Sequence, residues 1–180
     1  MYIRDKVLSL EEIEEAKTLY DSLEKKKVFQ YYNLFDLYRA DIPEPLDQYS
    51  FYKTLLRYSG LETHIGAPYF LKYVPGSFTR VHPDNDSKFT TVTLIESENL
   101  VGGDSIVLAP YDKGKTPSRP ANEICIRNER ETKTPPYGQD IVMDVIPFKD
   151  GDTLSYGPTL QHGVTMVHKG YRIVLVIWFK

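Results

Sequence analysis

The segment from residue 68 to residue 180 alternates between short runs of strand-forming residues and clusters of turn residues. The clusters include Pro75-Gly76, Gly102-Gly103 and Gly151-Asp152. The predicted strands cover eight ranges: Tyr69–Val74, Phe78–His82, Phe89–Ile95, Ser105–Leu108, Ile141–Val145, Thr153–Tyr156, Val164–Val167 and Tyr171–Phe179. Eight short strands with frequent turns are typical of a two-sheet jelly roll, in which each sheet covers the apolar face of the other.

The residues before position 60 show a helical pattern instead. Ser9 and Glu12 have the spacing of a capping box, and apolar residues then recur every three or four positions. This pattern predicts a helix over about 10–26. A second helix is predicted over about 46–58, with Gly60 as its stop signal.

These patterns predict a mainly β fold with N-terminal helices in a single domain, residues 1–180. Residues 68–180 form the double-stranded β-helix (jelly roll, cupin-like) core, and the helices within residues 1–60 support it. Residues 110–140 are rich in proline and charge, which predicts a loop insertion. That insertion is either a plain surface loop or a lid over a substrate groove.

Composition narrows the classes of function. The formal net charge is −3, so the chain lacks the basic footprint that binds a nucleic-acid backbone, and a nucleic-acid partner is disfavoured. Cys125 is the only cysteine, which excludes an internal disulfide and a thiolate metal cluster. No apolar run reaches 18 residues, so we expect no membrane partner. The charged N-terminus lacks a secretory pattern, and we expect a cytoplasmic protein.

The pattern His82-x-Asp84, followed by His162, supplies two imidazoles and one carboxylate. This is the ligand set of a 2-His-1-carboxylate iron site, which leaves metal positions open for a chelating acid and O₂. The pair His82-x-Asp84 alone is a weak signal, because Pro83-Asp84-Asn85 also has the chemistry of a simple turn. His64 and His168 are competing ligands, although each is better explained as a surface or packing residue.

Arg172 interrupts a strand that is otherwise apolar on both faces. An arginine buried there needs a partner, and a carboxylate held by two hydrogen bonds suits it best. A three-residue hairpin loop at His168–Gly170 would place Arg172 on the same face as His162, about 13 Å along the sheet. The alternative is that Arg172 lies at the start of its strand and reaches solvent.

Tyr73 is expected to lie at the same depth as Arg172. Val74-Pro75-Gly76-Ser77 suits a type II turn. If that turn closes a two-residue hairpin, Tyr73 lies opposite Phe78 and shares a face with His82. A phenol and a guanidinium together make a reasonable pocket for a buried carboxylate.

Three blocks of the chain resemble one family. The stretch from Tyr73 to Asp84, YVPGSFTRVHPD, is similar to Y-x-x-G-x-x-F/Y-x-x-H-x-D. Leu100–Asp104 is similar to a Gly-Gly-acid turn, and the block from Pro147 to Trp178 contains a histidine, a G-x-R motif and a closing tryptophan. Together they resemble the iron(II)/2-oxoglutarate dioxygenases, in the prolyl 4-hydroxylase-like branch, over about residues 68–180.

The resemblance implies Fe(II) bound by His82, Asp84 and His162. It implies 2-oxoglutarate, the co-substrate, held by Tyr73 and Arg172, and it matches Thr91 to a threonine position in the strand after the H-x-D loop. The branch often has a second tyrosine where Ile95 stands here, so fewer phenols bind the co-substrate. O₂ is the second co-substrate, and ascorbate is a candidate reductant.

The activity implied by the resemblance is hydroxylation of a C–H bond, with succinate and CO₂ as co-products. The favoured substrate is a prolyl residue of a peptide or protein, with Arg80 as a candidate substrate contact. One alternative is an oxygenase acting on a free amino acid or other small molecule. Another is a non-enzymatic jelly-roll binding module in which His82 and His162 lie far apart. A nucleic-acid base is disfavoured as substrate, because Ile173–Phe179 lacks a second arginine.

Overall fold

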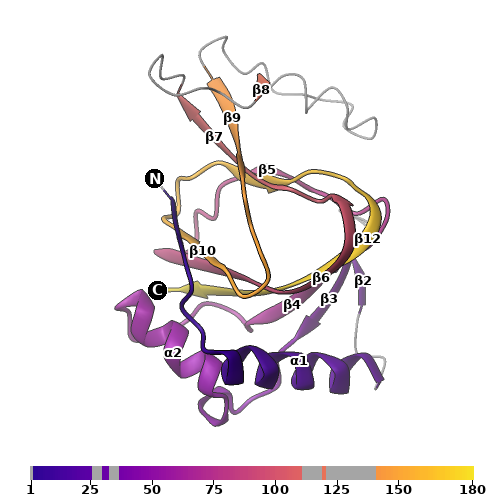
Figure 1. Ribbon diagram of the computed structural model, residues 1–180. Helices are drawn as coiled ribbons and strands as arrows, with labels where there is room; N and C mark the ends of the chain where they lie inside the picture. The colour runs from indigo at the N-terminus through magenta and orange to yellow at the C-terminus, as the bar shows by residue number, and fades with distance from the viewer. Residues whose placement is uncertain (1, 26–29, 33–36, 111–118, 121–140) are drawn as a thin grey trace.

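The computed structural model describes residues 2–25, 30–32, 37–110, 119–120 and 141–180 (Figure 1). The helical elements are α1 (Leu10–Lys25), the 3₁₀ turn η1 (Leu46–Gln48) and α2 (Ser50–Ser59). The strands are β1 (Tyr2–Asp5), β2 (Gln30–Tyr32), β3 (Leu37–Asp41), β4 (Tyr69–Tyr73), β5 (Thr79–His82), β6 (Phe89–Gly102), β7 (Ser105–Pro110), β8 (Arg119–Pro120), β9 (Ile141–Ile146), β10 (Thr153–Tyr156), β11 (His162–Val164) and β12 (Val167–Phe179).

The strands form two antiparallel sheets. The larger sheet has the order β1-β10-β6-β12-β4-β3-β2, and the smaller has the order β5-β11-β7-β9-β8. Figure 1 shows β6 and β12 curving side by side through the larger sheet, with both helices packed beneath it. The predicted jelly-roll core with N-terminal helices is confirmed.

The strand β12 is apolar on both faces because each face meets a different layer. Ile173, Leu175 and Ile177 join the core formed with the helices. Val174 and Val176 point the other way, into the space between the two sheets. The alternation of side chains along a strand therefore supplies two cores from one segment.

The capping box predicted for the first helix is present. The Ser9 backbone N–H donates to Glu12 Oε2 at 2.8 Å, and the Glu12 N–H donates to Ser9 Oγ at 3.2 Å. The second predicted helix begins later than expected, because Tyr49 is extended and separates η1 from α2. That helix ends at Gly60, as predicted, with a positive φ of 67°.

The predicted hairpin at His168–Gly170 is wrong. Instead, β12 runs without a break from Val167, pairs with β6 along its length, and absorbs the extra residues as register shifts. Val167 lies opposite Gly102, and Tyr171 lies opposite Glu98. Since β6 is long enough to pair with the whole of β12, continuing the ladder satisfies more backbone groups than turning back does. The chain instead changes sheets between β11 and β12.

The predicted pairing of Tyr73 with Phe78 is also wrong, although the turn itself is right. The Ser77 N–H donates to the Val74 carbonyl at 2.8 Å, and Gly76 has a φ of 93°, as a type II turn requires. However, β4 and β5 belong to different sheets, so this turn joins the sheets. The physical reason is that type II turns do not match the twist of a two-residue hairpin.

Most of the predicted insertion, residues 110–140, lies outside the described residues, and so does Cys125. The expectation of a lid or surface loop there stays a prediction. None of the described helices has the length and apolar character to cross a membrane.

Candidate metal and co-substrate site

His82 and His162 are direct neighbours across two paired strands. His82 is the last residue of β5, His162 is the first residue of β11, and the two are partners in the ladder. Asp84 lies in the loop that follows β5, with its Oδ1 3.5 Å from His82 Nε2 and its Oδ2 3.7 Å from His162 Nε2. One ligand atom from each residue lies within 4.8 Å of the other two. The structure thus brings together the three predicted metal ligands.

Backbone carbonyls set the tautomer of both imidazoles. His82 Nδ1 donates to the Arg80 carbonyl at 2.7 Å, and His162 Nδ1 donates to the Leu160 carbonyl at 2.9 Å. A carbonyl can only accept, so in each neutral ring Nε2 keeps its lone pair. Both lone pairs are therefore available on the side where Asp84 lies, which is the orientation that metal-binding histidines require.

Asp84 is held as a carboxylate although it is only 6% exposed. Burial raises its pKa, but the hydrogen bond with His82, the nearby His162 and the Thr90 hydroxyl together lower it below the usual value. Thr90 Oγ1 donates to Asp84 Oδ2 at 2.9 Å. The turn chemistry also exists, because Ser87 donates to the Asp84 carbonyl from its backbone N–H and its hydroxyl. This turn holds the backbone of Asp84 in place and so positions its carboxylate.

The two histidines differ in the balance of effects on their pKa. Burial lowers the pKa of His162, and the nearby Asp84 only partly opposes it. Burial also lowers the pKa of His82, but its hydrogen bonds with Asp84 and the Arg80 carbonyl outweigh it, and the pKa is raised. A divalent metal would compete with the proton for the Nε2 atom of His82.

One cavity of about 380 Å³ connects the three predicted metal ligands (the triad) to the residues predicted to bind the co-substrate. Its lining includes the triad together with Tyr73, Thr79, Ser105 and Arg172, and an apolar wall. The wall is made by Val92, Leu154, Val164, Val174 and Val176. Such a mixture of an apolar wall with a few convergent polar groups is typical of a ligand site.

Arg172 is only 2% exposed, which rules out the alternative that it reaches solvent. Its Nη1 donates to the Gly103 carbonyl, and both Nη1 and Nη2 donate to Ser105 Oγ at 3.2 Å. The guanidinium carbon lies 5.3 Å from the centre of the Tyr73 ring and 5.4 Å from that of Phe148. Burial lowers its pKa, whereas Tyr73 and Asp104 oppose that effect.

The donors of Arg172 that remain free lie along one edge of the guanidinium. Nε has no hydrogen-bond partner among the described residues, and Nη2 carries one hydrogen beyond its bond to Ser105. Nε and Nη2 form the fork that takes a carboxylate side-on. A buried cation with this edge unpaired fits an anionic ligand, because an unsatisfied buried donor is costly.

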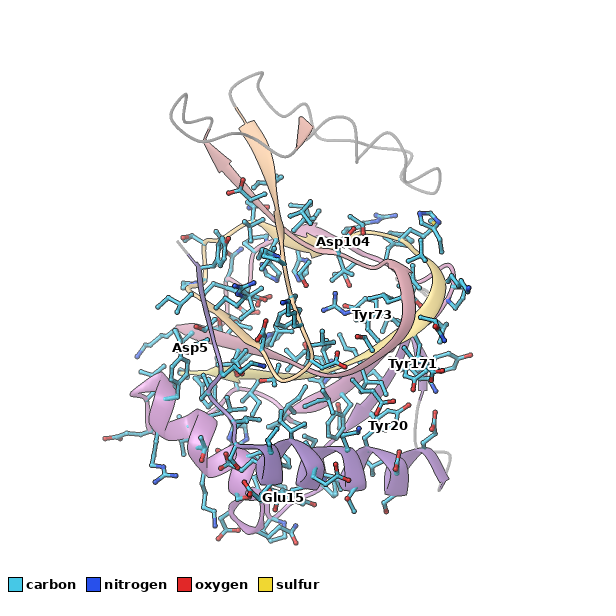
Figure 2. All side chains as sticks on the ribbon, viewed as in Figure 1. Asp5, Glu15, Tyr20, Tyr73, Asp104 and Tyr171 are labelled. Atoms are coloured by element: carbon cyan, nitrogen blue, oxygen red, sulfur yellow. The ribbon has the colours of Figure 1, made fainter. Side chains whose placement is uncertain are left out.

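Tyr73 is the partner of Arg172 across the β4–β12 ladder. Figure 2 shows its side chain pointing into the space between the two sheets. Its hydroxyl is 2.7 Å from Thr79 Oγ1. Burial raises the pKa of Tyr73, with Arg172 and Thr79 opposing, so the phenol keeps its proton and can donate it to a carboxylate. The predicted phenol and guanidinium therefore lie together, although both hairpins used to predict this are absent.

The structure does not bring Thr91 to this site. Val92 lines the cavity, and side chains alternate along a strand, so Thr91 points to the opposite face. Its neighbours in the ladder are Ser155 and Ile177, on the side of the helices. Thr90 is the threonine that reaches the triad. Thr90 and Val92 are two positions apart in β6, so the alternation of side chains places both on the same face once the structure shows which face Val92 occupies.

Neither competing histidine joins the triad. His64 Nδ1 is 2.7 Å from the Tyr52 hydroxyl, so His64 packs against α2. His168 is exposed at the start of β12. Ser105 was not predicted, because its role depends on the position of Arg172, which lies 67 residues further along the chain.

No family model matches the sequence, and no curated protein matches it either. Solved structures do match. A Pseudomonas putida prolyl-4-hydroxylase superposes with a TM-score of 0.64 over 99% of this chain and 92% of its own, at 14% identity. The chain has the fold of the iron(II)/2-oxoglutarate oxygenases.

Two further structures with this oxygenase fold contain ligands. The viral collagen prolyl hydroxylase of Paramecium bursaria Chlorella virus-1, in complex with 2-oxoglutarate, has a TM-score of 0.60 at 13% identity and covers 98% of this chain and 94% of its own. HygX from Streptomyces hygroscopicus, with nickel and 2-oxoglutarate bound, has a TM-score of 0.61 at 12% identity, covering 98% and 81%. The resemblance predicted from the sequence motifs is thereby confirmed for the fold.

Proposed function

We propose that the protein is an iron(II)- and 2-oxoglutarate-dependent dioxygenase that hydroxylates a C–H bond, with a prolyl residue of a peptide or protein as its substrate. One observation carries the proposal. Two imidazole lone pairs and a carboxylate converge in the same cavity as a buried arginine with a free side-on edge. A dicarboxylic acid that chelates the metal at one end and pairs with Arg172 at the other would satisfy both groups of residues.

His82, Asp84 and His162 would hold the metal, because two imidazoles and one carboxylate are the donor set of the non-haem iron oxygenases. When bound, iron with 2-oxoglutarate and O₂ supplies the oxidation that places one oxygen atom on the substrate and leaves succinate and CO₂. Ascorbate is proposed only as the reductant that keeps the iron in its Fe(II) state.

The residues of the chain would bind and orient 2-oxoglutarate and shield the site from water. The Nε–Nη2 edge of Arg172 and the Tyr73 hydroxyl would bind the far carboxylate of 2-oxoglutarate, and the Gly103 carbonyl and Ser105 keep the guanidinium in place. The apolar wall, which includes Val164 and Val174, excludes water from the space between the two ends.

The proposal of a prolyl substrate is supported by the neighbours that share the fold. They include a Trichoplax adhaerens prolyl hydroxylase in complex with a peptide fragment. They also include the carbocyclase SnoK from nogalamycin biosynthesis, with a TM-score of 0.63, so a small-molecule substrate is the alternative outcome of the test. The non-enzymatic alternative required His82 and His162 to lie far apart, and they are direct neighbours.

The test is an incubation with Fe(II), 2-oxoglutarate and O₂, with and without a panel of proline-containing peptides and a panel of free amino acids. Succinate is quantified, and each candidate is examined by mass spectrometry for the gain of one oxygen atom. Succinate release stimulated by peptides, with oxygen on proline, supports the proposal. Stimulation only by free amino acids supports the alternative. No succinate above that of the Asp84→Ala variant under any condition contradicts the dioxygenase itself.

A further inference from the structure

A second arginine, Arg39, lines the same cavity from β3. Its guanidinium carbon lies 3.8 Å from the centre of the Tyr69 ring, which is close stacking for a cation on an aromatic face. Its Nε also pairs with Asp41 Oδ1 at 2.8 Å. These two contacts hold a side chain that is still 34% exposed, so the charge is ordered before any ligand arrives.

Nη1 and Nη2 of Arg39 have no partner within the described part of the chain, since the bond to Asp41 uses Nε. Among the described residues that line the cavity, Arg172 is the only other arginine or lysine, and it is already assigned to the co-substrate. Arg39 is thus a cation in the cavity that takes no part in the proposed binding of the metal or of 2-oxoglutarate.

The surroundings of Arg39 form a pocket wall with one polar end. Tyr69 packs edge-on against Trp178, with ring centres 6.2 Å apart, and Leu37 and Leu71 line the cavity beside them. An aliphatic group would lie against these side chains while a polar group reaches the two free Nη atoms of Arg39. Such a division favours a ligand with an apolar part and one anionic part.

Two acidic residues limit which anion is acceptable. Asp41 is already paired with Arg39, and the exposed Asp86 lines the same cavity. A phosphate group carries almost two negative charges and would be repelled by both carboxylates. A single carboxylate forms one charge-assisted pair with the Nη atoms and meets less repulsion. The surroundings therefore favour a carboxylate over a phosphate.

We propose that Arg39 is a specificity-determining residue that binds a carboxylate of the substrate, so that the preferred substrates are peptides with an acidic residue adjacent to the target proline. This inference rests on the proposed function and adds the chemistry of the substrate to it. The substrate would place its ring against Tyr69 and Trp178, and its carboxylate on Arg39.

The experiment compares acids with their neutral amides, which have nearly the same shape. The probes are acetyl-Pro-Glu-amide against acetyl-Pro-Gln-amide, and acetyl-Glu-Pro-amide against acetyl-Gln-Pro-amide. Binding to the full chain loaded with Zn(II) and 2-oxoglutarate is measured by ligand-observed NMR, which needs no turnover. In at least one pair the acid is expected to bind about tenfold more tightly than the amide, the effect of one charge-assisted pair.

Arg39→Gln is expected to reduce this preference to less than about twofold, and Arg39→Lys to keep part of it, because lysine retains the charge without the fork. Arg57→Gln is the matched control, since Arg57 is exposed on α2, on the other side of the larger sheet. The affinity for 2-oxoglutarate, measured by calorimetry on the same samples, reports separately on the co-substrate site.

The proposal is overturned if acids and amides bind equally to the natural chain, if none of the acids binds, or if Arg39→Gln keeps the full preference. These results leave the proposed dioxygenase intact as long as 2-oxoglutarate still binds. Conversely, loss of 2-oxoglutarate binding in the natural chain contradicts the proposed function, whatever the acid preference.

Discussion

The rings of His82 and His162 lie side by side across the β5–β11 ladder, with their centres 4.5 Å apart and their planes inclined by 49°. The two residues are 80 positions apart in the chain, and each is oriented by a carbonyl two residues before it. Local backbone geometry therefore orients each imidazole, and strand pairing brings both rings to the side of the ladder where Asp84 lies.

Asp84→Ala is expected to lower the affinity for Fe(II) or Zn(II) by at least about 100-fold, because it removes a ligand outright and outer-shell changes alone cost 10–100-fold. The fold should survive, since Asp84 lies in a loop whose turn is made by its backbone carbonyl. Metal affinity is measured by competition with a chromophoric chelator, and the fold by circular dichroism. A folded variant with undiminished metal affinity would remove Asp84 from the site.

Arg172→Ala is expected to weaken 2-oxoglutarate binding by about 30-fold or more, because one partner of a buried charge pair is lost. Arg172→Lys should recover only part of the affinity, since it lacks the Nε–Nη2 fork. Calorimetry on Zn(II)-loaded protein measures both. Equal binding of 2-oxoglutarate and 2-oxobutyrate to the natural chain would show that no residue holds the far carboxylate.

Ser105→Ala is expected to weaken 2-oxoglutarate binding about fivefold, because the two Nη atoms of Arg172 lose a shared acceptor. Metal affinity should not change. Ser97→Ala is the control, since its hydroxyl bonds Asp150 away from the cavity. A change in metal affinity of the same size as the change for 2-oxoglutarate would indicate a general disturbance of the site.

Gly170→Ala is expected to destabilise the protein by at least about 2 kcal/mol. Gly170 has a φ of 74°, and an added Cβ would lie 2.1 Å from the Glu98 carbonyl oxygen of the paired strand. Gly157→Ala is the matched control, because an added Cβ there meets no atom within 4 Å. Urea unfolding measures both. Equal stabilities for the two variants would argue against the close approach of β12 to β6 at this bulge.

Local sequence was sufficient for several elements of the structure. The capping box placed the first turn of α1, and the proline-glycine pair placed the type II turn, because each depends on neighbouring residues alone. The types of residue needed for a metal and a dicarboxylic acid were also evident. Arg172 stood out because a cation in a strand apolar on both faces has few explanations.

Pairing between distant strands decided the rest. Both predicted hairpins failed, because the long β6 offers β12 a continuous partner and the turn after β4 leads into the other sheet. The same pairing places Thr90 beside Asp84 and turns Thr91 away from it, since neighbouring side chains in a strand point to opposite faces. Likewise, Ser105 next to Arg172 and Arg39 above Tyr69 depend on which strands are neighbours. Sequence by itself determined which chemical groups the protein carries and where its local turns begin. Only the tertiary structure determined which of these groups meet. The reason is that strand pairing depends on contacts between residues far apart in the chain.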